Sequence, residues 1–296
     1  MVNSLKDFHI CKITLMEKIK FLILLVLLSS CASKKIPEKK TITLLNYNIR
    51  YAQEDVGDIS WSNRNVNFLQ LIKDNPAEIY LFQEPTKDQV FFLENQFPAF
   101  HLIENGLRPF DSLSTHNVML IHESLKIIKH DAFWLSETPD KISRGWDAST
   151  ERICQYVLVK DKISKKEFYV FNVHLDRKGE ESKRKSLELI KQKAKEINTK
   201  NLPIFIGGDF NSMEHTSQIQ DFKDFLRDSK EVSLTPPKGP SGTFNFFDVN
   251  RENFPYRIDY IFVSDSIKVK KYEVIDTKYN NQFPSDHFPV KIEVEF

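Results

Sequence analysis

One short stretch of the chain presents two polar side chains at the end of an apolar run. In PIFIGGDFNS (203–212) the run stops at Gly207 and Gly208, and Asp209 and Asn211 follow. Glycines let the backbone turn sharply and come close to a ligand. A carboxylate in such a place can take a proton from an attacking water, and a carboxamide beside it can hold the water or a phosphate oxygen.

The same placement recurs along the chain, because other polar residues also stand in or just after apolar runs. They are Asn48, Glu84, His174, Asp259, Asp286 and His287. Strand ends at one edge of a sheet face a common crevice, a usual place for ligands in α/β folds. The set contains no Ser or Cys nucleophile. Hard cations such as Mg²⁺ prefer carboxylate and carbonyl oxygens, so the set favours metal-assisted phosphoester hydrolysis.

Each of these residues also has a structural interpretation. Glu84 could be a solvated strand end, 209–211 an Asx turn, His174 a core histidine, and 286–287 a cap or turn. Asp259 is harder to explain in this way, because a carboxylate inside an apolar run is costly to bury unless it is paired. The joint occurrence of all of them favours a functional site.

The elements that must position these residues alternate between apolar runs and amphipathic segments. Helices are predicted at 61–73, from Thr86, and at 180–197. Strands are predicted at 41–49, 78–84, 118–122, 126–136, 153–159, 167–175, 203–208, 257–263, 267–275 and 289–296. The layout predicts two sheet-rich halves with helices outside, an α/β sandwich in one domain.

The first 40 residues differ from the rest of the chain. After Met16 come two lysines, an apolar run at 21–28, and LSSC ending at Cys31. The run is too short to span a bilayer as a helix. It resembles a bacterial lipobox, so we expect a leader at 1–31, an acylated Cys31, a tether at 32–40 and a lipid-anchored protein of the cell envelope. An ordinary signal peptide and a buried helix are the alternatives.

Charge and cysteine content exclude some classes of protein. Residues 1–30 carry four lysines and two acidic residues, so a chain that starts at Cys31 has 38 basic and 39 acidic residues. This balance argues against an extended nucleic-acid-binding surface. Cys154 is then the only free thiol, so an internal disulfide is excluded and Cys154 is expected to be inert core. No obligate protein partner is evident.

Seven motifs occur in order and carry a resemblance to a known family. They are NYNIR (46–50), LFQE (81–84), WLSETP (134–139), NVHLD (172–176), GGDFN (207–211), RIDYIF (257–262) and PSDHFPV (284–290). Together they resemble the endonuclease/exonuclease/phosphatase family, over residues 41–296. The resemblance implies a catalytic domain built as a four-layer α/β sandwich. Two central, mostly antiparallel β-sheets would be flanked by helices, with Mg²⁺ or Mn²⁺ as cofactor.

The resemblance also implies roles for the polar residues at the metal. Glu84 would be a direct ligand, Asn48 would lie at the metal, and Asp286 would be a ligand or a partner of one.

For the reaction itself, the resemblance implies that Asp209 orients and deprotonates the attacking water and that Asn211 holds the phosphate or that water. His174 would contact the scissile phosphate. Asp259 would hold His287, whose imidazole would stabilise or protonate the phosphate.

Three residues are expected at the substrate. Arg152 matches a position where the family often has a phosphate-contacting Arg, and a structural ion pair is the alternative. Trp146 and Asp147 could form a wall of the substrate pocket or a packed loop. They lie in 134–149, which departs from the nucleases and resembles an uncharacterised bacterial branch, often secreted or lipid-anchored.

The sequence therefore predicts a metal-dependent hydrolase of phosphoester bonds, with a small or glycan-linked phosphoester preferred as substrate. A nuclease and a sphingomyelinase-like phospholipid hydrolase stay open. A catalytically dead binding lipoprotein is disfavoured, because the polar set is intact.

Overall fold

The computed structural model describes residues 41–53, 55–107 and 114–296. The expected leader, Cys31 and the tether lie outside the described residues. None of the helices in the described ranges has the length and apolar character needed to cross a membrane.

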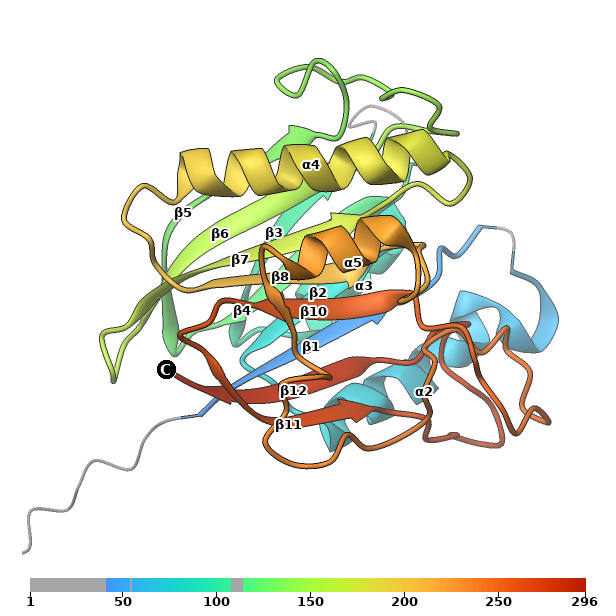
Figure 1. Ribbon diagram of the computed structural model, residues 1–296. Helices are drawn as coiled ribbons and strands as arrows, with labels where there is room; N and C mark the ends of the chain where they lie inside the picture. Colours follow the sequence, from blue (N-terminus) through green and yellow to red (C-terminus); the bar gives the residue numbers. More distant parts are fainter. Residues whose placement is uncertain (1–40, 54, 108–113) are drawn as a thin grey trace, which may run out of the picture. The chain divides into compact units, whose positions relative to one another are not determined.

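Two six-stranded sheets form the centre of the molecule (Figure 1). The first has the order β11-β12-β1-β2-β4-β3. Its strands are β1 (Ile42–Asn48), β2 (Ile79–Gln83), β3 (Phe100–Gly106), β4 (His116–His122), β11 (Lys268–Val274) and β12 (Val290–Glu295).

The second sheet has the order β5-β6-β7-β8-β10-β9. Its strands are β5 (Leu125–Trp134), β6 (Ile153–Asp161), β7 (Glu167–His174), β8 (Ile204–Asp209), β9 (Arg227–Asp228) and β10 (Asp259–Val263). Each sheet contains one parallel pair, β1 with β2 and β7 with β8, and its other pairs are antiparallel.

Helices cover the two outer faces. α2 (Trp61–Asp74) and α3 (Lys87–Gln96) pack on the first sheet, and α4 (Glu180–Ile197) and α5 (Ser217–Lys223) on the second (Figure 1). A short 3-10 helix, η1 (Gly57–Ile59), precedes α2. The four-layer α/β sandwich predicted from the sequence is confirmed.

The apolar patterns explain these layers. Leu187, Ile190 and Ala194 lie on one face of α4 and are buried against the second sheet. The strands β7 and β8 are buried on both faces and therefore read as continuous apolar runs. Cys154 is buried, as expected, and burial raises the pKa of its thiol.

Four elements were not predicted: η1, β3, α5 and the two-residue strand β9. The edge strand β3 is mostly half-buried and lacks a clear alternation of apolar and polar residues, so its pairing with β4 defines it. The helix α5 has only seven residues, too few for a readable period, and its buried residues Ile219 and Phe222 hold it on the second sheet.

The space between the sheets changes from apolar to polar near one end. Beside the apolar core, the side-chain amide of Gln83 donates to the side-chain oxygens of Asn46 at 2.9 Å and Asn172 at 2.7 Å. The amide of Asn46 in turn donates to the carbonyl of Gly208 at 3.2 Å. This amide layer ties the first sheet to the second just before the ends of both parallel strand pairs.

Candidate active site

Three neighbouring strands of the second sheet bring His174, Asp209 and Asp259 to the same level. In the parallel pair, His174 of β7 stands opposite Asp209 of β8, and in the antiparallel pair Asp209 stands opposite Asp259 of β10. Side chains opposite each other on adjacent strands share a face of the sheet. The result is a buried row of an imidazole and two carboxylates.

The two glycines before Asp209 have separate packing reasons. Gly208 has φ +155°, and an added Cβ would lie 2.0 Å from the carbonyl oxygen of Val173. At Gly207 an added Cβ would lie 2.6 Å from a methyl group of Leu81 on the first sheet. The glycines thus let β8 approach both its neighbour β7 and the facing sheet, which brings Asp209 to the side chains of β1.

The first sheet contributes Asn48 and Glu84. The amide nitrogen of Asn48 donates to Asp209 Oδ2 at 3.0 Å and to Glu84 Oε1 at 3.2 Å, so it bridges the two sheets. Its side-chain oxygen accepts from the backbone N–H of Arg50. Asn48 therefore orients the two carboxylates.

His287 and Asp259 form the expected pair. His287 Nδ1 lies 2.9 Å from Asp259 Oδ2, and its Nε2 lies 3.8 Å from Asp209 Oδ2. Burial opposes a charge on this imidazole, but the carboxylates of Asp259, Asp209 and Asp286 raise the pKa of His287 to about 10. His287 is therefore a cation at neutral pH.

His174 has the opposite character. Its Nε2 lies 3.6 Å from Asp209 Oδ2 and 3.8 Å from Glu84 Oε1. Burial, then the charge of the Arg152 guanidinium, whose Nη1 lies 3.3 Å from His174 Nδ1, keep the pKa of His174 well below its usual value. The site thus holds one neutral and one protonated imidazole on either side of Asp209.

The pKa of the Asp209 carboxyl group lies near neutral pH. Burial, then the charge of Asp259, raise its pKa to about 7, while His287 and hydrogen bonds from Asn211 and Asn48 act in the opposite direction. A carboxylate with such a pKa can act as a general base at physiological pH.

Asn211 is held with one polar atom free for a ligand. Its backbone N–H donates to Asp209 Oδ1 at 2.9 Å and its side-chain NH₂ donates to the carbonyl of Leu175 at 3.0 Å. Its own carbonyl accepts from the buried ammonium of Lys183 at 3.2 Å. The side-chain oxygen is the atom left for the pocket, which Asn211 lines.

Arg152 is positioned by Asp176, the last residue of the NVHLD motif. Its Nε lies 3.4 Å from Asp176 Oδ1. Asp176 also accepts hydrogen bonds from Ser149 Oγ and from the backbone of Lys178 and Gly179. Burial works against ionisation of Asp176, but these donors hold its pKa far below the usual range. Arg152 is thus both ion-paired and directed at the site.

These side chains surround a pocket of about 400 Å³. Its lining residues are Arg50, Tyr51, Glu84, Ser149, Arg152, His174, Arg177, Lys178, Asp209, Asn211, Phe244, Phe246, Ile258, Asp286 and His287. Four of them carry a guanidinium or ammonium group, which suits an anionic ligand.

Strained backbone gathers at this pocket. Arg50, Glu84, Asn211 and Phe246 all have φ between +46° and +70°. Such conformations cost non-glycine residues about 1–3 kcal/mol each and persist where the surrounding structure holds them. The left-handed turn at Glu84 comes directly after the end of β2, and Arg50 reaches Asp286, with Nη1 and Oδ2 3.6 Å apart.

The structure does not bring Trp146 and Asp147 into the pocket lining. Asp147 instead accepts hydrogen bonds from the backbone N–H groups of Ser182 and Glu181, and so caps the start of α4. Trp146 is half-buried, with φ +47°, and its backbone N–H donates to the carboxylate of Glu137. Both residues thus lie in a loop tied to α4 and to Glu137, outside the lining of this pocket.

The donor set fits a hard divalent cation. Glu84, Asp209 and Asp286 offer carboxylate oxygens to one pocket. Asp209, Asp259 and His287 also have ligand atoms within 4.8 Å of one another, but a protonated His287 has no lone pair to offer a cation. Asp259 Oδ1 is buried and has no hydrogen-bond partner among the described residues.

Several residues at the pocket were not predicted. Arg50 and Asp176 stand inside the motifs NYNIR and NVHLD, so their position beside Asn48 and His174 could have drawn attention to them. Phe244 and Phe246 stand in a loop to which the sequence assigned no chemistry. Their place depends on pairing with residues 285–288, which no local pattern reveals.

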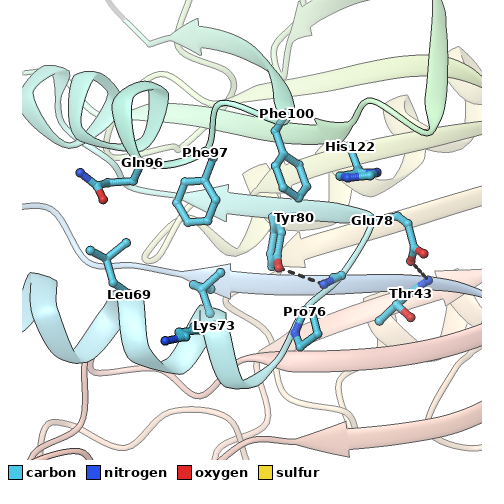
Figure 2. Close-up of a pocket in the computed structure, with 12 residues that line it drawn as sticks. Thr43, Leu69, Lys73, Pro76, Glu78, Tyr80, Gln96, Phe97, Phe100 and His122 are labelled. Atoms are coloured by element: carbon cyan, nitrogen blue, oxygen red, sulfur yellow. Dashed lines mark hydrogen bonds between the residues drawn. The ribbon is translucent and has the colours of Figure 1, made fainter.

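A larger hollow lies elsewhere, on the outer face of the first sheet between α2 and α3 (Figure 2). It measures about 690 Å³, and the rings of Tyr80, Phe97 and Phe100 project into it beside Leu69. Its only ionisable side chains are Lys73, Glu78, Tyr80 and His122, and Glu78 accepts a hydrogen bond from the backbone of Thr43.

Comparison with known proteins assigns the chain to a family. The sequence profile of the endonuclease/exonuclease/phosphatase family matches residues 45–287. A mannosyl-6-phosphatase from Bacteroides thetaiotaomicron is 34% identical, with a TM-score of 0.81 over 86% of this chain and 100% of that one.

Two further relatives have no stated substrate. A second Bacteroides thetaiotaomicron protein of the same family is 33% identical, with a TM-score of 0.80 over 87% of this chain and 98% of that one. An uncharacterised protein of Acanthamoeba polyphaga mimivirus is 28% identical over 79% of this chain and 92% of its own length. On the profile match and these identities, the chain belongs to the endonuclease/exonuclease/phosphatase family.

Proposed function

We propose that this protein is a divalent-metal-dependent phosphatase that hydrolyses the phosphate monoester of a sugar or glycan. Family membership supports a hydrolase that acts on phosphoester bonds. The observation that carries the proposal is the convergence on Asp209 of Asn48, His174 and His287, all within 3.8 Å of one carboxylate oxygen. The similarity to a mannosyl-6-phosphatase at 34% identity supports a phosphorylated sugar as substrate.

Glu84 and Asp286, together with Asp209 in the same pocket, would hold the cation. When bound, it supplies positive charge that polarises the phosphoryl group and stabilises the leaving oxygen. Asn48 keeps the carboxylates of Glu84 and Asp209 oriented through its two hydrogen bonds.

The residues of the chain account for the remaining steps. Asp209 accepts a proton from a water while the oxygen of that water bonds to phosphorus, and Asn211 Oδ1 holds the water in line. The bond from phosphorus to the sugar oxygen breaks, and this oxygen takes a proton from solvent, which yields inorganic phosphate and the alcohol. Asp209 then returns the proton it accepted to solvent. His287 as a cation, neutral His174 as an N–H donor, and Arg152 stabilise the charge on the phosphoryl oxygens.

A direct test compares a sugar 6-phosphate, a phosphodiester and a sphingomyelin dispersion as substrates of the purified protein, with and without Mg²⁺ or Mn²⁺. The expected result is metal-dependent release of phosphate from the sugar, reduced at least 100-fold in His174→Ala. Preferential cleavage of the diester would establish a nuclease-like enzyme, and cleavage of sphingomyelin a phospholipid hydrolase. Inactivity on all three with no specific response to Mg²⁺ would support a dead scaffold.

We also propose that the protein is exported and anchored in the bacterial cell envelope through lipid on Cys31. The support is the leader pattern from Met16 to Cys31. Expression of the full chain with labelled palmitate should label the protein, and Cys31→Ser should remove both the label and the membrane association. A labelled Cys31→Ser variant would contradict the assignment.

A further inference from the structure

Phe244 and Phe246 line the pocket, and they belong to a row of aromatic rings that begins at the imidazole of His287 and ends outside the lining, at Tyr256. The ring of Phe244 lies 4.8 Å from that of His287, and 4.2 Å from that of Phe246. Tyr256 follows, with its centroid 5.6 Å from Phe246. The row leads from the phosphate site toward the surface, since Phe246 is 46% and Tyr256 43% exposed.

The backbone that carries this wall is strained and firmly held. Phe246 and Phe247 have φ of +61° and +58°, an uncommon conformation for bulky residues. Buried Asn245 anchors the turn, because its side-chain NH₂ donates to the carbonyl of Ser285 at 3.0 Å and its side-chain oxygen accepts from the N–H of Phe247 at 2.7 Å.

Backbone bonds connect the same turn to the catalytic segment. The N–H of Asn245 donates to the carbonyl of Asp286 at 2.7 Å, and that of Phe246 to the same oxygen at 3.2 Å. The guanidinium of Arg251 also lies over the Phe246 ring, 4.8 Å from its centroid. A partly exposed ring in a strained turn tied to Asp286 and His287 indicates a ligand contact, since strain of this kind gathers at binding and catalytic sites.

Apart from Ile258, the other residues that line the pocket are polar. Arg177, Lys178 and Ser149 are exposed and line the same pocket. A pyranose ring matches two such walls, because it has an apolar C–H face and a rim of hydroxyl groups. A nucleobase would stack equally well on the rings, but the near-neutral charge of the chain gives no support for a nucleic-acid substrate.

We propose that Phe246, together with Phe244 and Tyr256, forms a stacking platform for the sugar that leaves the phosphate, and that this platform determines the preference for sugar phosphates. The inference rests on the proposed phosphatase function. The apolar face of the sugar lies on Phe246, and its hydroxyl groups face Arg177, Lys178 and Ser149.

The kinetic test uses the ratio of kcat/KM for mannose 6-phosphate to kcat/KM for glycerol 3-phosphate, which is also a monoester of a primary alcohol but has no ring. Phe246→Ala should lower this ratio about tenfold, mainly through KM of the sugar phosphate, and Phe246→Trp should restore it. Phe91→Ala is the matched control, because Phe91 is 67% exposed on α3 and does not line the pocket. An equal loss on both substrates would mean that Phe246 is only structural.

A binding measurement separates failure of this inference from failure of the proposed function. Saturation-transfer NMR with methyl α-mannoside and the full-length protein needs no hydrolysis. Transfer to the ring protons should be seen in the wild type and lost in Phe246→Ala. Absence of transfer in the wild type would overturn the platform even if the protein is an active phosphatase. Stronger dependence on Phe246 for adenosine 5′-monophosphate than for the sugar would overturn it in favour of a base-stacking site.

Discussion

The two hollows described above differ in size and in chemistry, and the larger one is the poorer candidate. The groove between α2 and α3 measures about 690 Å³, against about 400 Å³ for the pocket at Asp209. None of the residues that line the groove has a positive φ in the described part of the chain, whereas Arg50, Glu84, Asn211 and Phe246 in the pocket do.

The pKa values of the groups in the two hollows favour the same choice. In the groove, burial raises the pKa of Tyr80 to about 12, which is the usual effect on a packed phenol. In the pocket, burial and then Arg152 lower the pKa of His174, and burial and then Asp259 raise that of Asp209. Burial also opposes the charge of His287, but the neighbouring carboxylates raise its pKa. Convergent titratable groups on strained backbone thus mark the functional site better than volume does.

The largest expected effect comes from the carboxylate at the centre of the pocket. Asp209→Asn keeps the size of the side chain but removes the proton acceptor, so kcat should fall at least about 1,000-fold. Steady-state kinetics, with circular dichroism as a control for folding, measure this. Retention of more than a tenth of wild-type kcat would exclude Asp209 as the base.

A second variant tests whether Lys183, which does not line the pocket, positions Asn211. Lys183 is 95% buried at its side chain, and its ammonium donates to the carbonyl of Asn211 and pairs with exposed Glu180. Lys183→Met should lower kcat about 10- to 100-fold with little change in KM, because Asn211 loses its positioning donor.

The matched control for this variant is Glu180→Gln, which removes the ion pair and keeps the bond to Asn211. Its kcat should stay within about twofold of wild type. In an Asn211→Ala background, Lys183→Met should add little further loss. Full additivity of the two losses would show that Lys183 acts on stability and not through Asn211.

The pH dependence of kcat/KM offers a third test. Asp209 must be ionised to accept a proton, and its raised pKa of about 7 in the metal-free protein means that activity should fall about tenfold per pH unit below 7 at limiting Mg²⁺. A bound cation favours the ionised form, so saturating Mg²⁺ should move this limb to lower pH. His287, with its pKa raised to about 10, should stay protonated through neutral pH. If the fall of kcat/KM at low pH occurs at the same pH with limiting and with saturating Mg²⁺, Asp209 does not interact with the metal.

The smallest effect on catalysis is expected in the groove. Phe97 is half-buried and contacts Tyr80 and Phe100. Phe97→Ala should reduce the free energy of unfolding by about 1–2 kcal/mol through lost packing, while kcat/KM stays within about twofold. Thermal unfolding and kinetics on the same preparation check both parts. A large loss of activity without a loss of stability would make the groove part of the functional machinery.

Much of the fold could be predicted because its signals are local. Apolar runs mark β1, β7 and β8, and the period of α4 is clear from Leu187, Ile190 and Ala194. The candidate residues at the strand ends were found in the same way. Register then brought His174, Asp209 and Asp259 together, as expected for strands that end at one edge.

The features that the sequence did not reveal depend on contacts between distant segments. Asn46, Gln83 and Asn172 read as ordinary strand residues until the two sheets face each other. Asp147 stands two residues after Gly145 and resembles a loop residue near a substrate. Its oxygens instead accept hydrogen bonds at the start of α4, more than 30 residues away in the sequence. The platform at Phe246 likewise needs the carbonyl of Asp286, 40 residues away in the sequence.

The course of β1 has a consequence for how Asn48 reaches the pocket. β1 begins at Ile42, next to the expected tether, and ends at Asn48 in the pocket. Over its seven residues β1 spans about 23 Å in a single direction. The pocket lies at the end of β1 opposite to Ile42. The chain therefore enters the domain at one end of this strand and delivers Asn48 to the pocket at the other, so the polar contacts of Asn48 do not depend on where the chain enters.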